Sequence, residues 1–161
     1  MRDFDVKLPD GRVLLADCNL TIKEGERLLI TGASGCGKST LLRTLAGIWP
    51  YGQGRIEIPE KSRILFLPQR PYLPLGSLRR ALYYPLSASG PEENLKEVLR
   101  KVGLADFIPR LDDIDDWSRI LSLGEQQRLA FARVLLVKPD WVFLDEATSA
   151  LDEPREQEMY A

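Results

Sequence analysis

The N-terminal part of the chain alternates short apolar segments with turn residues. Apolar segments occupy residues 4–8, 13–22 and 27–30, and Pro9-Asp10-Gly11 and Glu24-Gly25 separate them. Short apolar runs bounded by Gly, Pro and Asp are typical of strands joined by tight turns. We therefore expect strands here, and further strands at residues 55–58 and 64–67.

From Lys38 onward the apolar spacing changes to that of a helix. One helical face collects the leucines Leu41, Leu42 and Leu45. Gly47 lies where such a helix would end. The same spacing predicts an amphipathic helix over residues 92–102 and a second helix over 123–137.

Two segments between and after these helices have a different character. Prolines interrupt residues 68–85, which we expect to be irregular and to lie on the surface. The apolar run 141–144 precedes Asp145-Glu146, as in a buried parallel strand that ends at a site. Strands that alternate with helices predict an α/β fold with a parallel-sheet core and an N-terminal antiparallel β-subdomain.

Composition narrows the possible chemistry. The 161 residues are 44% hydrophobic and 29% charged, which fits one folded domain. The chain has no histidine, so Ser-His-Asp triads and HExxH zinc sites are excluded, and acid-base chemistry falls to carboxylates. Two cysteines, Cys18 and Cys36, are too few for a disulfide framework and fit a reducing compartment.

Charge and hydropathy indicate a soluble domain. The 22 Lys and Arg against 24 Asp and Glu give a net charge of −2, which argues weakly against nucleic-acid binding. No apolar run approaches the roughly 18 residues of a membrane span, and the charged N-terminus is unlike a signal peptide.

Residues 32–39 match the phosphate-loop pattern GxxxxGK[ST], between an expected strand and an expected helix. Lys38 would contact the β- and γ-phosphates and Ser39 would ligate Mg²⁺, while backbone N–H groups and the helix N-terminus bind phosphate oxygens. The alternative is an ordinary glycine-rich turn, but a chance match is on the order of one in a few hundred. The expected nucleotide-binding residues are Gly32, Ala33, Ser34, Gly35, Cys36, Gly37, Lys38, Ser39 and Thr40.

Asp145 and Glu146 follow the apolar strand in the Walker B arrangement. Asp145 would hold the Mg²⁺ shell. Glu146 is then placed to polarise the attacking water. Alone, such an acidic pair is more often a turn, but the phosphate loop makes that alternative weak.

Two stretches complete a pattern that resembles the ATP-binding cassette (ABC) proteins. Residues 121–128, Leu-Ser-Leu-Gly-Glu-Gln-Gln-Arg, resemble the signature motif, and residues 145–152, Asp-Glu-Ala-Thr-Ser-Ala-Leu-Asp, resemble the Walker B motif and D-loop. The resemblance covers nearly the whole chain. It implies a P-loop NTPase (RecA-like) core with a helical signature subdomain, and two domains that pair head to tail around ATP.

The signature stretch also has a physical interpretation. Ser122 followed by Glu125 is a capping box, so a helix should begin here with free N–H groups. Capping alone is the simpler explanation, but with the other motifs we expect Ser122 and Gly124 to meet the γ-phosphate of a partner's ATP. Leu123 and Glu125 depart from the common LSGGQ form, and Glu125 would repel phosphate unless the cap holds it away.

Gln69 follows the expected strand 64–67 and resembles the Q-loop glutamine, which contacts Mg²⁺ or water; a lone loop glutamine is usually only solvated. Residues 66–74, with the Leu-Gly-Glu signature, are similar to exporter-type half-transporters of the YddA/SbmA/BacA-like and peroxisomal fatty-acyl-CoA (ABCD) groups. No tyrosine lies near Leu8 to stack on adenine, and Phe4 is the nearest aromatic residue.

The resemblance implies a further strand and a switch histidine about thirty residues beyond Glu146. The chain contains neither, so we expect an ABC domain that is incomplete at its C-terminus. Residues 1–68 and 138–161 should form the core and β-subdomain, and residues 69–137 the Q-loop and helical subdomain. Whether such a chain hydrolyses ATP by itself stays open.

The sequence therefore predicts the ATP-binding and hydrolysing domain of a membrane transporter, with ATP and Mg²⁺ as cofactors. Glu146, Lys38 and Gln69 are the expected catalytic residues, and Ser39, Gln69 and Asp145 the expected metal ligands. The expected partners are a second such domain and a transmembrane domain fused upstream, at the cytoplasmic face of a membrane, which is the inner membrane in a bacterium. Alternatives are a soluble ABC ATPase acting on nucleic acid or ribosomes, a nucleotide-binding module without turnover and, with least support, a small-molecule kinase.

Overall fold

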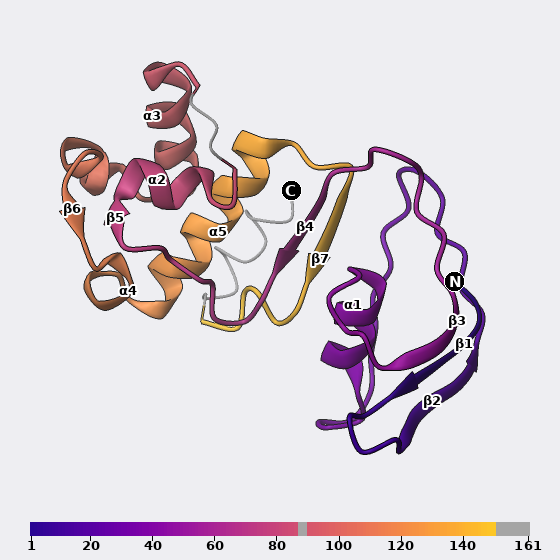
Figure 1. Ribbon diagram of the computed structural model, residues 1–161. Coiled ribbons are helices and arrows are strands. Elements are labelled where there is room, and N and C mark those ends of the chain that lie inside the picture. Colours follow the sequence, from indigo (N-terminus) through magenta and orange to yellow (C-terminus); the bar gives the residue numbers. More distant parts are fainter. Residues whose placement is uncertain (87–89, 151–161) are drawn as a thin grey trace. The chain divides into compact units, whose positions relative to one another are not determined.

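The computed structural model describes residues 1–86 and 90–150 (Figure 1). The chain divides into two compact units, Met1–Phe66 and Leu67–Ala161. Leu151 and Asp152 of the expected D-loop lie outside the described residues.

The first unit is built on a three-stranded antiparallel sheet in the order β2-β1-β3. Its strands are β1 (Arg2–Lys7), β2 (Val13–Cys18) and β3 (Gly52–Arg55). The turn between β1 and β2 closes where the Leu8 N–H donates to the Arg12 carbonyl at 2.8 Å. A Cβ on Gly54 would lie 2.5 Å from the Asp3 carbonyl oxygen, so glycine allows β3 to approach β1 closely. This sheet is the antiparallel β-subdomain that the sequence predicts.

Helix α1 (Lys38–Leu45) follows in the same unit. It ends where the sequence places its stop: Gly47 has a φ of 74°, and its N–H donates to the Thr44 carbonyl at 3.0 Å. Two predicted strands are wrong. Residues 27–30 form none, and Leu29 is 83% exposed, so this apolar stretch has no packing surface to hold it as a strand. Residues 56–58 are also not a strand, because β3 ends at Arg55.

The second unit is mainly helical (Figure 1). Strand β4 (Ile64–Leu67) leads into it from the first unit and forms a two-stranded sheet with β7 (Trp141–Leu144). A second small sheet pairs β5 (Gly76–Ser77) with β6 (Ile114–Asp115), antiparallel. The helices are α2 (Leu78–Tyr83), α3 (Glu92–Lys101), η1 (Ala105–Arg110), α4 (Trp117–Ile120) and α5 (Leu123–Val137).

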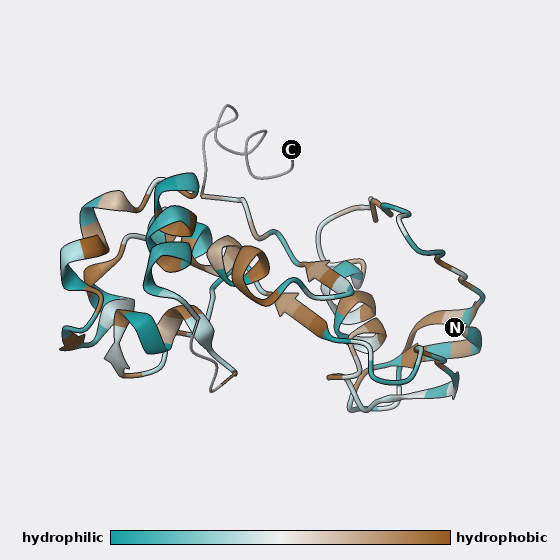
Figure 2. Ribbon diagram, turned by 90° about the horizontal axis from the view of Figure 1, so that it is seen from above, coloured by the Kyte–Doolittle hydropathy of each residue, from teal (hydrophilic) through white to brown (hydrophobic). Residues whose placement is uncertain are grey.

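The core of this unit gathers apolar side chains from all these helices around Trp117, which is fully buried. Helix α3 contributes Leu95, Val98 and Leu99 at the predicted helical spacing, and its opposite face is charged. The helices accordingly carry both apolar and polar residues along their ribbons (Figure 2). The predicted helices over 92–102 and 123–137, and the strands 64–67 and 141–144, are confirmed.

The proline-rich stretch 68–85 is not irregular throughout, contrary to the sequence interpretation. It contains β5 and α2, and Leu78, Ala81 and Leu82 are each at most 1% exposed. The Ser77 hydroxyl caps α2 by accepting from the Arg80 N–H at 3.2 Å. The prolines Pro74 and Pro85 flank this helix instead of interrupting it.

Strand β7 is less buried than expected, because Val142 is 37% exposed. A sheet of two strands leaves side chains open to solvent. Among the described residues, no helix is long and apolar enough to cross a membrane.

Candidate functional site

The predicted phosphate-loop residues, 32–40, all belong to the first unit. Residues 32–37 form a loop that leads into α1, and Gly37 is the N-cap of this helix. Gly35 and Gly37 have φ angles of 76° and 101°, which side chains with a Cβ rarely adopt. The loop conformation therefore depends on glycine at both positions, as the motif predicts.

The Lys38 ammonium group folds back onto this loop. Its Nζ donates to the carbonyl oxygens of Gly32 and Ala33, each at 2.9 Å. Backbone carbonyls are neutral acceptors, so a phosphate oxygen in the same place would bind this cation more strongly. Lys38 is thus held at the loop, next to the helix N-terminus.

The first turn of α1 favours an anion. It contains no acidic residue, so nothing on the helix opposes its positive end. Ser39 and Thr40 lie in this turn. Together with the backbone N–H groups of the loop, the turn has the chemistry that polyphosphates require.

The two predicted carboxylates lie at the end of β7 in the second unit. The Asp145 N–H donates to the Leu67 carbonyl at 2.9 Å, which ties the end of β7 to the end of β4. Asp145 is 6% exposed. Glu146 is exposed and has a φ of 51°, an unusual value for a residue other than glycine.

A turn after β7 helps to hold this conformation. The Ser149 N–H donates to the Glu146 carbonyl at 3.1 Å. Backbone strain of this kind costs about 1–3 kcal/mol and persists where the surrounding structure fixes it. Here it turns the chain immediately after the strand.

Gln69 lies beside this turn. Its Nε2 donates to Oε2 of Glu146 at 3.1 Å and to the Ser149 hydroxyl at 3.5 Å. The structure therefore brings together Gln69 and Glu146, which are far apart in the sequence.

The signature residues begin α5 as expected. The Ser122 hydroxyl accepts from the Glu125 N–H at 3.3 Å, and the Glu125 carboxylate accepts from the Ser122 N–H at 2.8 Å. The Ser122 hydroxyl also donates to the same carboxylate oxygen at 2.7 Å. The predicted capping box is confirmed, and Glu125 is turned back onto Ser122.

Two residues of α5 that the sequence interpretation did not select are central to this region. Gln127 is fully buried, and its side chain is hydrogen-bonded to Gln69, Ser149 and Ala150. Arg133 is 5% exposed. Both are polar residues in a helix whose neighbouring positions, such as Leu129 and Ala132, are buried, and this pattern is the signal that could have revealed them.

Arg133 connects α5 to the segment that follows β4. Its guanidinium donates to the carbonyls of Ala81 and Tyr72 at 2.9 and 2.8 Å and lies 5.7 Å from the ring centre of Tyr84. Burial lowers the pKa of Arg133 to about 10. It remains a cation at neutral pH.

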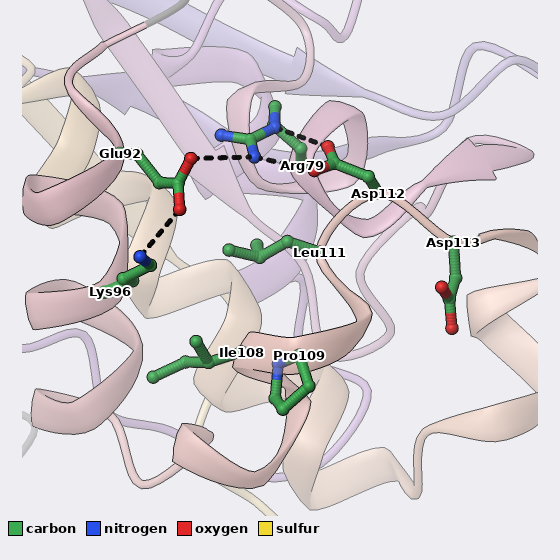
Figure 3. A pocket seen from close by; sticks show the side chains of 8 residues that line it. All are labelled: Arg79, Glu92, Lys96, Ile108, Pro109, Leu111, Asp112 and Asp113. Carbon is green, nitrogen blue, oxygen red and sulfur yellow. Dashed lines mark hydrogen bonds and ion pairs between the residues drawn. The ribbon is translucent and has the colours of Figure 1, made fainter.

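A pocket of about 340 Å³ lies elsewhere in the second unit, between α2, α3 and η1 (Figure 3). Four of its charged groups pair with one another. Arg79 donates to both carboxylate oxygens of Asp112, at 2.7 and 3.0 Å, and Lys96 lies 2.7 Å from Glu92. The hydrogen bond from Arg79 lowers the pKa of Asp112, and that from Lys96 lowers the pKa of Glu92. None of the expected site residues lines this pocket.

The donor set of the expected metal ligands suits Mg²⁺. Ser39, Gln69 and Asp145 offer hydroxyl, amide and carboxylate oxygens, which are the hard donors that this ion prefers. In the described part of the chain, no group of three or more His, Cys, Asp or Glu side chains could hold a metal by itself.

A glycine loop at a helix N-terminus and an Asp-Glu pair after a strand define the class of P-loop ATP-binding domains. Comparison with known proteins gives the family. The ABC transporter family model matches residues 15–149. The chain belongs to the ABC transporter family, as an ATP-binding domain.

Similar proteins support this family assignment. An uncharacterised ABC transporter ATP-binding protein of Synechocystis is 52% identical and covers 93% of the chain. The inner membrane ABC transporter ATP-binding protein YddA of Escherichia coli and human ATP-binding cassette sub-family D member 3 are each 40% identical, over 94% and 95% of the chain. These matches confirm the resemblance to YddA and to the ABCD group. The chain spans only about a quarter of these relatives' length, at 23%, 27% and 25%.

A solved structure supports the same fold. The structure of a bacterial Atm1-family ABC exporter with ATP bound has a TM-score of 0.83 and 27% identity. It covers 99% of this chain, which corresponds to 31% of that one. The predicted fold class is therefore confirmed.

Proposed function

We propose that this domain binds Mg-ATP and hydrolyses it to power the transport cycle of the protein that carries it. The observation that supports hydrolysis most directly is the hydrogen bond between Gln69 and Glu146. It holds an exposed carboxylate beside the end of β7, where Glu146 is expected to polarise the attacking water.

The residues divide the chemistry between them. The loop of residues 32–37 and Lys38 bind the phosphates, and Lys38 exchanges the carbonyls of Gly32 and Ala33 for phosphate oxygens. Ser39, Gln69 and Asp145 would hold Mg²⁺, which neutralises the charge that develops on the phosphates. Glu146 accepts a proton from the attacking water.

The signature end of α5 binds the ATP of a second domain in a head-to-tail dimer. The Gly124 backbone and the Ser122 hydroxyl, which would exchange the Glu125 carboxylate for a phosphate oxygen, supply the polar contacts at a helix N-terminus that is favourable for anions. Glu125 does not obstruct this, because its carboxylate is bound to the Ser122 N–H and hydroxyl. The capping box therefore explains how an acidic residue is tolerated beside a phosphate.

The membrane-associated part of the function rests on the relatives. YddA is named as an inner membrane protein, and the structural neighbour is an exporter. We infer that a transmembrane domain in the complete protein couples to this domain at the cytoplasmic face of a membrane. ATP that binds the closed dimer better than the open one then supplies the driving force.

Calorimetric titration with Mg-ATP tests the proposal. The chain should bind ATP with saturation, and Lys38→Ala should abolish binding without unfolding the chain. In the complete protein, Glu146→Gln should abolish phosphate release while ATP binding is retained. Failure of a folded wild type to bind ATP would contradict the proposal, and hydrolysis stimulated by DNA or RNA would favour the soluble alternative.

A further inference from the structure

Gln127 joins three segments of the second unit through one side chain. Its Nε2 donates to the Gln69 carbonyl at 3.0 Å and to the Ser149 hydroxyl at 3.2 Å. Its Oε1 accepts from the Ala150 N–H at 3.0 Å. The side chain thus connects helix α5, the second residue after β4 and the turn after β7.

The orientation of this amide is determined by its partners. A carbonyl can only accept and a backbone N–H can only donate, so the nitrogen must face Gln69 and the oxygen must face Ala150. Gln127 is fully buried, which prevents the side chain from taking alternative positions in solvent. It therefore fixes the two segments in a defined relative position.

Gln127 makes hydrogen bonds to the segments that carry Gln69 and Glu146. Gln127 holds Gln69 by its backbone, while the Gln69 side chain donates to Glu146. The Ser149 hydroxyl accepts from both glutamine side chains, and the Ser149 N–H closes the turn on the Glu146 carbonyl. Loss of Gln127 would release both sides of the contact that orients Glu146.

A second hydrogen bond from α5 restricts the segment that begins at Gln69. Arg133, farther along α5, donates to the Tyr72 carbonyl at 2.8 Å. The segment from Gln69 to Tyr72 is therefore attached to α5 near both of its ends, so its position follows that of α5. The N-terminus of this helix carries the signature residues Ser122 and Gly124.

A contribution to folding stability alone does not explain why a glutamine makes these hydrogen bonds. Gln69, Ser149 and Ala150 are exposed residues, so water can replace some of the hydrogen bonds that they make to Gln127. An apolar side chain of similar length would fill the buried space of Gln127 at modest cost. What such a side chain cannot do is fix Gln69 against the turn after β7.

We propose that Gln127 is a positioning residue for ATP hydrolysis: it sets the Gln69 backbone and the turn at 146–150 so that the Gln69 side chain orients Glu146. This inference rests on the proposed function. Gln127 touches neither ATP nor water in this role and acts through Gln69.

A double-mutant cycle in the complete protein tests this, with steady-state ATPase kinetics as the readout. Gln127→Met should lower kcat about tenfold to a hundredfold, because small displacements of a catalytic group have effects of that size. The KM for ATP should change by less than about twofold, because the variant leaves ground-state binding intact. In a Gln69→Ala background, Gln127→Met should reduce kcat by no more than about twofold further.

A purely structural role predicts a different pattern. Gln126 is a matched control, because its Nε2 donates to the Ser118 and Leu121 carbonyls at the start of the same helix and does not contact Gln69. The effects of Gln126→Met and Gln69→Ala on kcat should multiply. Unchanged kcat in Gln127→Met, or the same multiplication with Gln69→Ala, overturns the proposal.

A second variant serves if Gln127→Met does not fold. Gln127→Glu keeps an acceptor for the Ala150 N–H but places an oxygen against the Gln69 carbonyl, so it should lower kcat and show the same non-additivity with Gln69→Ala. The ATPase activity of the wild type distinguishes a failure of the proposed function from a failure of this inference. If it shows no ATPase activity that depends on Lys38 and Glu146, the proposed function fails; if it does and the Gln127 variants are normal, only this inference fails.

Discussion

The side-chain amide of Gln69 lies 3.1 Å from the carboxylate of Glu146, to which it donates a hydrogen bond. The two residues follow neighbouring strands, β4 and β7. The Asp145 N–H donates to the Leu67 carbonyl, so the strands end at the same level and the residues just beyond them meet. The small sheet thus explains why a loop glutamine can orient a carboxylate 77 positions later.

The first prediction concerns this contact. Gln69→Ala removes the donor and leaves Glu146 without its partner, so kcat for ATP hydrolysis in the complete protein should fall about tenfold to a hundredfold. Calorimetry should find Mg-ATP binding weakened far less than kcat, because the phosphate loop and the other two expected Mg²⁺ ligands are intact. Arg70→Ala, at the exposed next residue, is the control and should leave both quantities near wild type. A parallel loss in both variants would mean that the segment as a whole matters and not the amide.

The second prediction concerns the capping box of α5. Glu125→Ala removes the carboxylate that binds the Ser122 N–H, so the free energy of unfolding in urea should fall by about 0.5–2 kcal/mol. Glu125→Gln keeps an acceptor for that N–H and should cost less than Glu125→Ala. It also restores the residue common in the family.

The same pair of variants separates stability from ATP recognition. Size-exclusion chromatography with ATP, in a Glu146→Gln background, reports dimer formation. The Glu125→Gln variant should dimerise at least as well as the protein that keeps Glu125, because the substitution removes a negative charge near the expected phosphate. Weaker dimerisation in Glu125→Gln would show that the carboxylate contributes to the interface.

The third prediction concerns Trp117 at the centre of the helical core. Its ring is fully buried, packs edge-on against Phe107 at 6.2 Å and lies 4.8 Å from the Arg110 guanidinium. Its Nε1 donates to the Gly76 carbonyl at 3.0 Å. Trp117→Ala should therefore cost about 3–5 kcal/mol of unfolding free energy.

Trp117→Phe isolates the hydrogen bond from the packing. It retains most of the apolar contact and leaves the Gly76 carbonyl without this donor, so its cost should be about 1–3 kcal/mol. Urea denaturation followed by circular dichroism measures both variants without using tryptophan fluorescence. Equal losses in the two variants would contradict this division.

The motifs made much of the candidate site predictable from the sequence. A phosphate loop requires glycines at fixed spacing, and Gly35 and Gly37 adopt the left-handed angles that this requirement implies. The capping box of Ser122 and Glu125 is equally local, since both of its hydrogen bonds lie within one helical turn. Such features depend on neighbouring residues, which the sequence shows directly.

What the sequence did not reveal depends on tertiary contacts. Gln127 looks like one of several polar residues in a helix, and only its contacts with Gln69 and Ala150 distinguish it. The segment around Leu29 shows the opposite error: it has the composition of a strand, but Leu28 and Leu29 are exposed in the structure. Strand formation depends on a partner more than on propensity, so this error follows from a missing neighbour.

The last prediction concerns the ion pair between Arg79 and Asp112, at the pocket between α2, α3 and η1. The hydrogen bond from Arg79 lowers the pKa of Asp112 in the folded chain. A carboxylate with a lowered pKa stabilises the folded state above the pKa of the unfolded chain, and this contribution is lost as the pH falls through the folded value. The loss should therefore appear on the acid side, below about pH 4.

Asp112→Asn removes the titrating group, so the free energy of unfolding should fall less steeply with acidification than in the wild type. Arg79→Met removes the cause of the shift and should flatten the same part of the curve. Both groups are partly exposed, so 1 M salt should reduce the difference from the wild type by screening. Urea denaturation between pH 2 and pH 7 measures these slopes, and an Asp112→Asn curve parallel to the wild type would show that this pair does not contribute to acid sensitivity.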